Sequence, residues 1–184
     1  HQGTRKFLML ARKGITAALI CVCSVAACGQ ENQRQERAVR DLLARWNTAY
    51  RSLDAKALAA LQTPDFEIVN RLGQWTPTFS TLQNEQMWAW AFTNIYKGKP
   101  GPDHKIERVR LVSSDVALVQ ARAYWNNVIV LDDGTRIPPH GEIDTFVVVR
   151  KAHAWRIAAL NIHNQMPPFD IKPGEPLAVP YPPK

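Results

Sequence analysis

Residues 147–164 read VVVRKAHAWRIAALNIHN, and they contain two strand-like runs separated by a short turn. The first run is rich in valine. In the second run apolar residues alternate from Trp155 to Ala159, which is typical of a strand with one buried face. Asn161 and His163 then take the next two places on that same face. The stretch therefore predicts a β-hairpin whose buried face becomes polar towards its end.

Upstream of this hairpin the pattern indicates helices first and strands later. Apolar residues at helical spacing run from Val39 to Leu53. Asp54 is a suitable N-cap for a second, short helix, and Ser80 with Gln83 forms a capping box for a third. Strand-like runs cover 66–70, 104–112, 116–131, 136–150 and 155–163. This order predicts an α+β fold, in which about three helices pack on the concave face of a curved antiparallel sheet.

Three stretches carry a resemblance to a known superfamily. They are RWNTAYRSLDAKALAALQTPDFEIV (45–69), DVALVQARAYW (115–125) and the hairpin VVVRKAHAWRIAALNIHN. In order and spacing, residues 36–165 resemble the SnoaL-like branch of the nuclear transport factor 2-like superfamily. The resemblance implies a cone-shaped fold that encloses a pocket. The superfamily includes ketosteroid isomerases, scytalone dehydratase, polyketide cyclases and pure binding modules, so the fold alone leaves the function open.

One branch of the superfamily can be compared residue by residue. Ketosteroid isomerases place an oxyanion-donating tyrosine in the first helix and a basic aspartate at the end of the first strand. The matching positions here are Trp46 and Asn70. An indole can donate one hydrogen bond, but an amide cannot act as a general base near neutral pH. The resemblance therefore does not imply isomerase chemistry by that mechanism.

The turn at residues 152–153 predicts how the last two strands pair. A two-residue turn there opposes Asp144 to Asn161 and Glu142 to His163, and opposed residues share a face of the sheet. The predicted pocket face comprises Ala117, Val119, Ala121, Ala123, Trp125, Glu142, Asp144, Phe146, Val148, Trp155, Ile157, Ala159, Asn161 and His163. A pairing that differs by one residue would move all the pocket-face side chains of one strand to the other face of the sheet.

A second turn, at residues 133–134, predicts the pairing of the two preceding runs. It opposes Ala123 to Asp144 and Trp125 to Glu142. The small alanines leave room above the sheet, so this face is expected to border a pocket with a carboxylate, an amide and an imidazole at its mouth. Apolar walls with a few convergent polar groups are typical of a small-molecule site.

The candidate site residues follow from this face and from the helices above it. Residues expected to contact a ligand are Trp46, Tyr50, Asn70, Trp125 and Asn161. His163 with Asp144 or Glu142 is a candidate catalytic pair, because a carboxylate can orient an imidazole and raise its basicity. Each of these residues has a structural alternative, as a core ring or a strand-end polar group. His104, His140 and His153 lie near predicted loops or turns and are expected to be solvated.

Three functions remain open. The first is a module that binds a small apolar, oxygenated molecule, which the loss of both isomerase residues favours. The second is an acid/base enzyme of the cyclase, dehydratase or isomerase type that uses His163. The third is a cell-envelope interaction module. No metal-ligand spacing, serine elbow or phosphate loop occurs in the sequence, so neither a metal nor another cofactor is expected.

The first 28 residues predict an export signal. Arg12 and Lys13 form a basic region, and residues 15–27 are apolar but too short to span a bilayer comfortably. The junction Val-Ala-Ala before Cys28 resembles a bacterial lipobox, with an ordinary cleaved signal as the alternative. The protein is therefore expected in the bacterial cell envelope or in the periplasm or medium, with a lipid on Cys28 as its one attachment to a membrane.

The net charge of +7 does not predict nucleic-acid binding. Four of the 23 basic residues precede residue 28, which leaves 19 against 16 acidic residues in the rest of the chain. No basic run or RNA-binding aromatic motif occurs there. No cysteine follows residue 28, so no internal disulfide is expected in the mature domain.

The chain divides into four predicted segments. After the signal, residues 29–35 form a polar tether, 36–165 the cone domain, and 166–184 an extended tail with seven prolines. The outer face of the last hairpin is apolar and predicts a homodimer. Its members are Ile143, Thr145, Val147, Val149, Ala158, Leu160 and Ile162.

Overall fold

The computed structural model describes residues 29–71, 73–126, 128–130, 134 and 136–164. The predicted signal, Cys28 and the predicted tail lie outside these residues. The first described element is a helix over residues 29–51. It is followed by α2 (Ala55–Ala60), β1 (Gln62–Val69), β2 (Trp75–Pro77), α3 (Thr81–Asn94), β3 (Lys105–Leu111), β4 (Val116–Trp125), β5 (Ile129–Val130), β6 (Arg136–Ile137), β7 (His140–Lys151) and β8 (Ala154–Asn164). This order confirms the α+β class.

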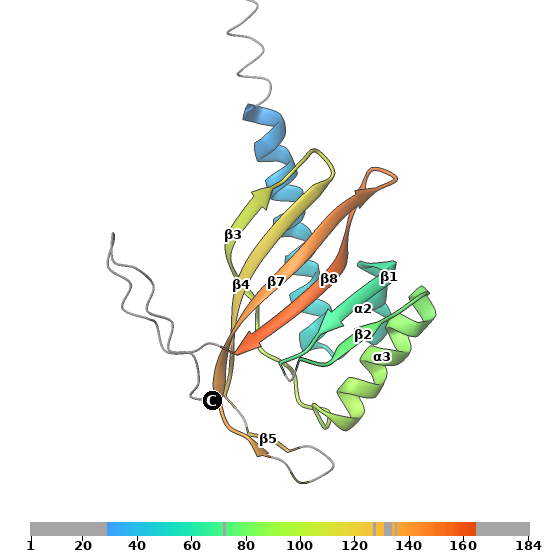
Figure 1. Cartoon of the computed structure of the whole chain (residues 1–184), viewed down its shortest axis with the longest axis vertical. Coiled ribbons are helices and arrows are strands. Elements are labelled where there is room, and N and C mark those ends of the chain that lie inside the picture. The colour runs from blue at the N-terminus through green and yellow to red at the C-terminus, as the bar shows by residue number, and fades with distance from the viewer. Residues whose placement is uncertain (1–28, 72, 127, 131–133, 135, 165–184) are drawn as a thin grey trace, which may run out of the picture.

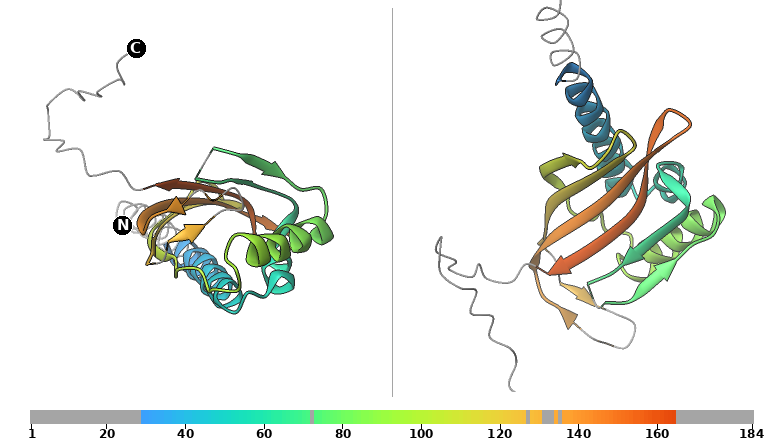
Figure 2. Two further views of the ribbon diagram at one scale, coloured as in Figure 1. Left: turned by 90° about the horizontal axis from the view of Figure 1, so that it is seen from below. Right: turned by 45° about the horizontal axis from the view of Figure 1, so that its top comes forward.

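Six strands form one curved sheet in the order β2-β1-β8-β7-β4-β3, and β5 and β6 form a second, two-stranded sheet. The N-terminal helix and α3 lie on the same side of this sheet (Figures 1 and 2). Because β1 runs parallel to β8 while the other neighbours in this sheet are antiparallel, the sheet is mixed rather than fully antiparallel as predicted. The cone of a curved sheet with helices on its inner face is otherwise as expected.

Both internal helices begin at the predicted caps. At the start of α2, the Asp54 carboxylate accepts a hydrogen bond from the N–H of Ala57 at 2.8 Å. At the start of α3, the Ser80 hydroxyl accepts one from the N–H of Gln83 at 3.2 Å, and the Gln83 side chain accepts one from the N–H of Phe79 at 2.7 Å. These bonds satisfy backbone donors that a helix start leaves free.

The N-terminal helix begins earlier than predicted. Residues 29–35, which were predicted to be a tether, form its first turns. Gln35 is only 7% exposed, and its side-chain oxygen accepts a hydrogen bond from Nε1 of Trp155 at 2.9 Å. This bond connects the beginning of the helix to β8. The polar composition of residues 29–35 gave no indication of this contact with Trp155.

The pairing of β4 with β7 differs from the predicted one by two residues. Ala123 lies opposite Glu142, and Trp125 lies opposite His140. Alternate residues of a strand point to the same side, so a shift of two leaves every side chain on its predicted face. Glu142 and Asp144 therefore face the interior, where they are 2% and 0% exposed.

The pairing of β7 with β8 agrees with the prediction only as far as Ile157. The turn at residues 152–153 has φ angles of 48° and 66°, and a two-residue hairpin turn with positive φ at both positions fits the twist of the strands. Val148 lies opposite Ile157, as predicted, but the next pair joins Val147 to Ala159. One residue of β8, Ala158, is skipped, which makes this a β-bulge.

The bulge reverses the two faces of the second half of β8. Asn161 lies opposite Thr145 and His163 opposite Ile143, on the outer side of the sheet. Leu160 takes the interior position and is 1% exposed. The predicted placement of Asn161 and His163 is therefore wrong, because a shift of one residue moves every later side chain to the opposite face.

Candidate functional site

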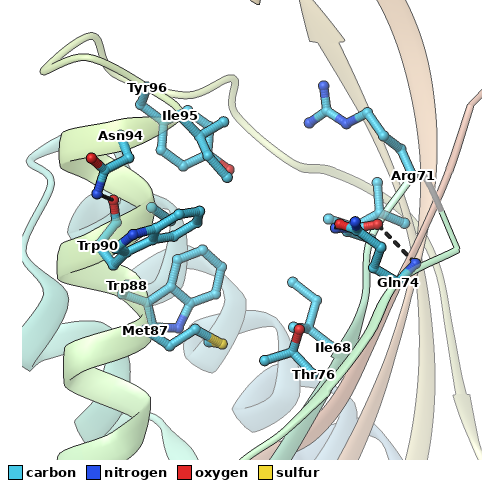
Figure 3. A pocket seen from close by; sticks show the side chains of 13 residues that line it. Ile68, Arg71, Gln74, Thr76, Met87, Trp88, Trp90, Asn94, Ile95 and Tyr96 are labelled. Carbon is cyan, nitrogen blue, oxygen red and sulfur yellow. Dashed lines mark hydrogen bonds between the residues drawn. The ribbon is translucent and has the colours of Figure 1, made fainter. Parts of the chain in front are cut away.

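A cleft opens between α3 and the β1–β2 hairpin (Figure 3). Its volume is about 280 Å³. Its lining residues are Ile68, Asn70, Arg71, Gln74, Thr76, Met87, Trp88, Trp90, Ala91, Asn94, Ile95, Tyr96 and Ile162. Most of these side chains are apolar, and a few amide or charged groups lie among them. The cleft is thus formed by one helix face and one hairpin, with a single residue from β8.

The β1–β2 turn places polar groups at one end of the cleft. The N–H of Asn70 donates to the carbonyl oxygen of Gln74 at 3.0 Å, and the two side-chain amides bond at 2.8 Å. Gly73 has a φ of 74°, a value that glycine adopts without strain. Asn70 does line the cleft, but its amide closes this turn. Its position is therefore explained by the hairpin alone.

Arg71 lies at the same end of the cleft and is held by three neighbours. Its Nη2 is 3.0 Å from Oε1 of Glu142, its Nη1 is 3.1 Å from Nε2 of His140, and its Cζ lies 5.0 Å from the ring centre of Trp125. Nε1 of Trp125 donates to Oε2 of Glu142 at 2.8 Å. The Arg71 and Glu142 side chains are 9% and 2% exposed, and charges so buried require partners of this kind.

Two tyrosines stand between the cleft and the interior. The hydroxyl groups of Tyr96 and Tyr50 are 2.7 Å apart, and the Tyr96 ring stacks on Trp125 with a centroid distance of 5.2 Å. Burial raises the pKa of Tyr96 to about 12. Burial, and then the neighbouring Tyr96, raises the pKa of Tyr50 well above its ordinary value. Both hydroxyl groups are therefore protonated near neutral pH.

Stability is expected to fall as the pH rises above about 10. The unfolded chain releases a tyrosine proton near pH 10, whereas folded Tyr96 keeps it until about pH 12. The stabilisation is complete below pH 10 and is lost across this interval, by at most about 2.7 kcal/mol. Urea unfolding at several pH values should show a smaller decline for Tyr96→Phe than for the wild type. Equal declines would contradict the assignment.

Deeper in the interior, His104 and Asp144 form a second buried pair. Nε2 of His104 is 2.9 Å from Oδ2 of Asp144, and the side chains are 4% and 0% exposed. The contact is short but poorly aligned, so neither carboxylate oxygen accepts a well-formed hydrogen bond from the described part of the chain. The imidazole lies edge-on to the rings of Tyr50 and Phe146, at 5.4 and 5.5 Å.

Asn47 determines where the protons of this pair lie. Its Nδ2 donates to the carbonyl oxygen of His104 at 3.0 Å, and its Oδ1 accepts the N–H of His104 at 2.9 Å. The amide oxygen therefore faces Nδ1, 3.2 Å away, so Nδ1 carries a hydrogen. Without a further proton on one of them, Nε2 and Oδ2 of Asp144 would be two acceptors 2.9 Å apart, so the pair carries a second proton. His104 and Asp144 together then carry no net charge.

The catalytic pair predicted for His163 is not formed. His163 is exposed on the outer side of the sheet, while Asp144 and Glu142 face the interior. The two carboxylates instead contact histidines from other segments of the chain. His104 contacts Asp144, and His140 contacts Glu142 at 3.2 Å.

The prediction that the loop histidines are solvated is wrong for two of the three. His104 is 5% exposed, and the side chain of His140 is 14% exposed. His153, in the β7–β8 turn, is exposed. Buried His104 lies just before β3 and half-buried His140 is the first residue of β7, where a loop side chain can turn into the interior.

The predicted aromatic ligand contacts belong to the core and are absent from the cleft lining. Trp46 is 0% exposed and packs edge-on against Trp88 and Phe146, at centroid distances of 5.3 and 5.7 Å. Tyr50 is 4% exposed, and Trp125 lies behind Tyr96. Asn161, on the outer side, does not line the cleft either.

Several residues that line the cleft are not among those predicted from the sequence. Arg71 lies in the β1–β2 turn, just after the predicted strand 66–70, and β2 is not among the predicted strands. Met87 and Ala91 of α3 and Ile95 at its C-cap recur every four residues, and all three line the cleft. That spacing was visible in the sequence and could have identified the helical wall of the cleft.

Two further findings concern the described residues only. They contain no group of three or more histidine, cysteine, aspartate or glutamate side chains placed to hold a metal ion. Likewise, none of their helices has the length and apolar character needed to cross a membrane.

Comparison with solved structures supports the fold. An uncharacterised protein with a cystatin-like fold from Caulobacter vibrioides is 19% identical, with a TM-score of 0.62 over 72% of this chain and 90% of that chain. A ketosteroid isomerase-like protein from Erwinia carotovora atroseptica is 16% identical, with a TM-score of 0.57 over 71% and 96%. An NTF-2-like protein of unknown function from Shewanella oneidensis is 14% identical, with a TM-score of 0.54 over 70% and 98%.

These likenesses define the architecture of the chain. It has the cystatin-like, nuclear transport factor 2-like cone fold, as the SnoaL-like resemblance implied. Comparison with protein-family models and with curated protein sequences gives no match. At identities this low, the function has to be inferred from the site.

Proposed function

We propose that this domain is a binding module whose cleft holds a small, largely apolar molecule that carries oxygen. The composition of the cleft is the observation that supports the proposal, since apolar walls with a few polar groups at one end are typical of small-molecule sites. Its volume of about 280 Å³ favours a ligand of one or two rings. Trp90, which is 58% exposed, offers a flat aromatic surface at the rim.

Binding without a chemical step is favoured by the ionisable groups of the cleft. Among the described lining residues, only Arg71 and Tyr96 carry such groups. An arginine stays protonated in proteins, and the pKa of Tyr96 is about 12, so neither accepts a proton near neutral pH. The pair of His104 and Asp144 is not part of the lining. The acid/base alternative therefore has no base in the described cleft.

The proposal is tested by filling the cleft. Ala91 is 8% exposed and lines the helical wall, so Ala91→Trp should block binding of a neutral two-ring probe such as 2-acetylnaphthalene in isothermal titration. Ala89→Trp makes the same change at an exposed position of α3 outside the lining and should bind as the wild type does. Native mass spectrometry of the purified protein would reveal a ligand that co-purifies. Equal binding by the wild type and both variants would rule out this cleft.

We also propose export and lipidation at Cys28, a residue outside the described part of the chain. The basic and apolar segment that ends in Val-Ala-Ala-Cys supports this proposal. In a bacterial host that processes lipoproteins, Cys28→Ser should move the protein from the membrane fraction to the soluble fraction. Mass spectrometry of the wild type should show added acyl chains. An unmodified wild-type mass, with the same fractionation for both proteins, would exclude lipidation.

The outer face of the sheet supports a third proposal, a homodimer. Ile143, Val147 and Val149 are half-buried there, whereas Leu160 and Ile162, also predicted for this patch, face the interior because of the bulge. In a two-fold contact each substitution acts twice, so Val147→Lys should give a monomer in light scattering. Gln86→Lys, at an exposed position on α3, serves as the control. A wild type that is monomeric at high concentration would refute the dimer.

A further inference from the structure

The charge at the polar end of the cleft is determined by Arg71, Glu142 and His140. Nδ1 of His140 is 2.7 Å from the carbonyl oxygen of Pro138, which can only accept, so Nδ1 carries a hydrogen. Nε2 is 3.1 Å from Nη1 of Arg71, which can only donate. Nε2 is also 3.2 Å from Oε1 of Glu142, which can only accept, so this nitrogen lies between a donor and an acceptor. The opposite charges of Arg71 and Glu142 cancel.

Arg71 keeps donors for a ligand after these contacts are made. A guanidinium has five N–H groups. The described contacts engage one on Nη2, towards Glu142, and one on Nη1, towards His140. The Arg71 side chain also borders the cleft, and Figure 3 shows it at the polar end, across from Tyr96, which lies just after α3. The ion pair thus fixes the guanidinium in position without using all of its donors.

We propose that Arg71 determines ligand specificity by donating to an uncharged acceptor oxygen, such as that of a ketone, ester or ether. This inference rests on the proposed function and specifies its ligand class. A ligand carboxylate would bring a second negative charge close to the buried Glu142, where water screens little. A cation would be repelled by Arg71. A hydrocarbon would displace water from donors and leave them without partners, which is costly.

Three probes of one shape separate these classes. They are 2-acetylnaphthalene, which is neutral with an acceptor oxygen, 2-naphthoate, which is anionic, and 2-ethylnaphthalene, which has no oxygen. Binding to the full chain is measured by isothermal titration at pH 8. Each probe is compared with itself across variants, so that differences in water solubility cancel. The wild type is expected to bind 2-acetylnaphthalene and to bind 2-naphthoate much more weakly.

Two variants change the charge in different ways. Glu142→Gln keeps an acceptor for Nε1 of Trp125 but leaves Arg71 without its counter-charge, so it should bind 2-naphthoate about tenfold more tightly than the wild type does. The double variant Arg71→Met with Glu142→Gln removes both charges. It should lose about tenfold in affinity for 2-acetylnaphthalene and should bind 2-ethylnaphthalene at least as tightly as the wild type does, because no donor is then left without a partner.

The outcomes distinguish this inference from the proposed function. If 2-acetylnaphthalene binds the double variant as well as it binds the wild type, Arg71 is not the recognising group, although the cleft still binds ligands. The same holds if 2-naphthoate binds the wild type most tightly. If no probe binds the wild type, the proposed function fails and the inference with it. The double variant carries no unpaired buried charge, so its affinities test the role of Arg71 even if Glu142→Gln folds poorly.

Discussion

Replacing Glu142 with alanine is expected to lower the free energy of unfolding by about 3–5 kcal/mol. The carboxylate is 2% exposed, lies 3.0 Å from Nη2 of Arg71, and accepts the indole hydrogen of Trp125 at 2.8 Å. Its removal leaves a guanidinium that is 9% exposed without its anion. A buried charge that loses its partner costs more than the pair contributed when intact, so urea denaturation should show a large loss.

Two controls show whether the unpaired charge is the cause. Glu107→Ala removes a carboxylate that is 40% exposed and pairs loosely, at 3.6 Å, with Arg122, so it should cost no more than about 1 kcal/mol. Adding Arg71→Met to Glu142→Ala should recover a substantial part of the loss, because no orphan charge then remains. A double variant as unstable as the sum of the two single variants would mean that packing, and not charge, explains the loss.

A second large effect is expected for His104→Leu, which should also cost about 3–5 kcal/mol. Among the residues that the structure describes, His104 contacts the Asp144 carboxylate, and the Asp144 side chain is 0% exposed. Leucine preserves an apolar contact with the rings of Tyr50 and Phe146 but supplies no donor. The carboxylate would then be buried without a partner, and denaturation should occur at much lower urea concentrations.

Paired measurements again identify the cause. Adding Asp144→Asn to His104→Leu should restore part of the stability, because a neutral amide costs less to bury than a carboxylate. His163→Ala is the matched histidine control: its ring is exposed on the outer side of the sheet, so the change should stay within about 0.5 kcal/mol and should not alter ligand binding. Weaker ligand binding by His163→Ala would contradict the placement of this residue.

The fold could be predicted from the sequence because its signals are local and periodic. Asp54 and Ser80 cap their helices through bonds to residues three positions later. The predicted pairing of β4 with β7 was displaced by two residues, yet Glu142 still faces inwards as expected, because the side-chain period of a strand is two. A pairing error of two residues equals this period, so it leaves every side chain on its predicted face of the sheet.

The site could be predicted only in part, for two physical reasons. The bulge at Ala158 adds a single residue, and such a shift inverts the faces, so Asn161 and His163 were placed on the wrong side. His104 and His140 enter the interior from chain segments next to strand starts, where no periodic pattern indicates direction. The inward direction of Glu142 and Asp144, which lie within a regular strand, was predicted correctly, and the histidines that contact them were not.

The bulge also has an evolutionary consequence. Loss of Ala158 would only remove the bulge and keep Leu160 opposite Phe146. Gain of one regularly paired residue just before Leu160 would instead turn Leu160 outwards and move His163 opposite Glu142, towards the interior. No single replacement of one side chain by another could exchange so many positions at once. In this scaffold, gain of one residue just after the bulge in β8 is therefore the mutational event that can redistribute imidazole and amide groups between the interior and the outer surface.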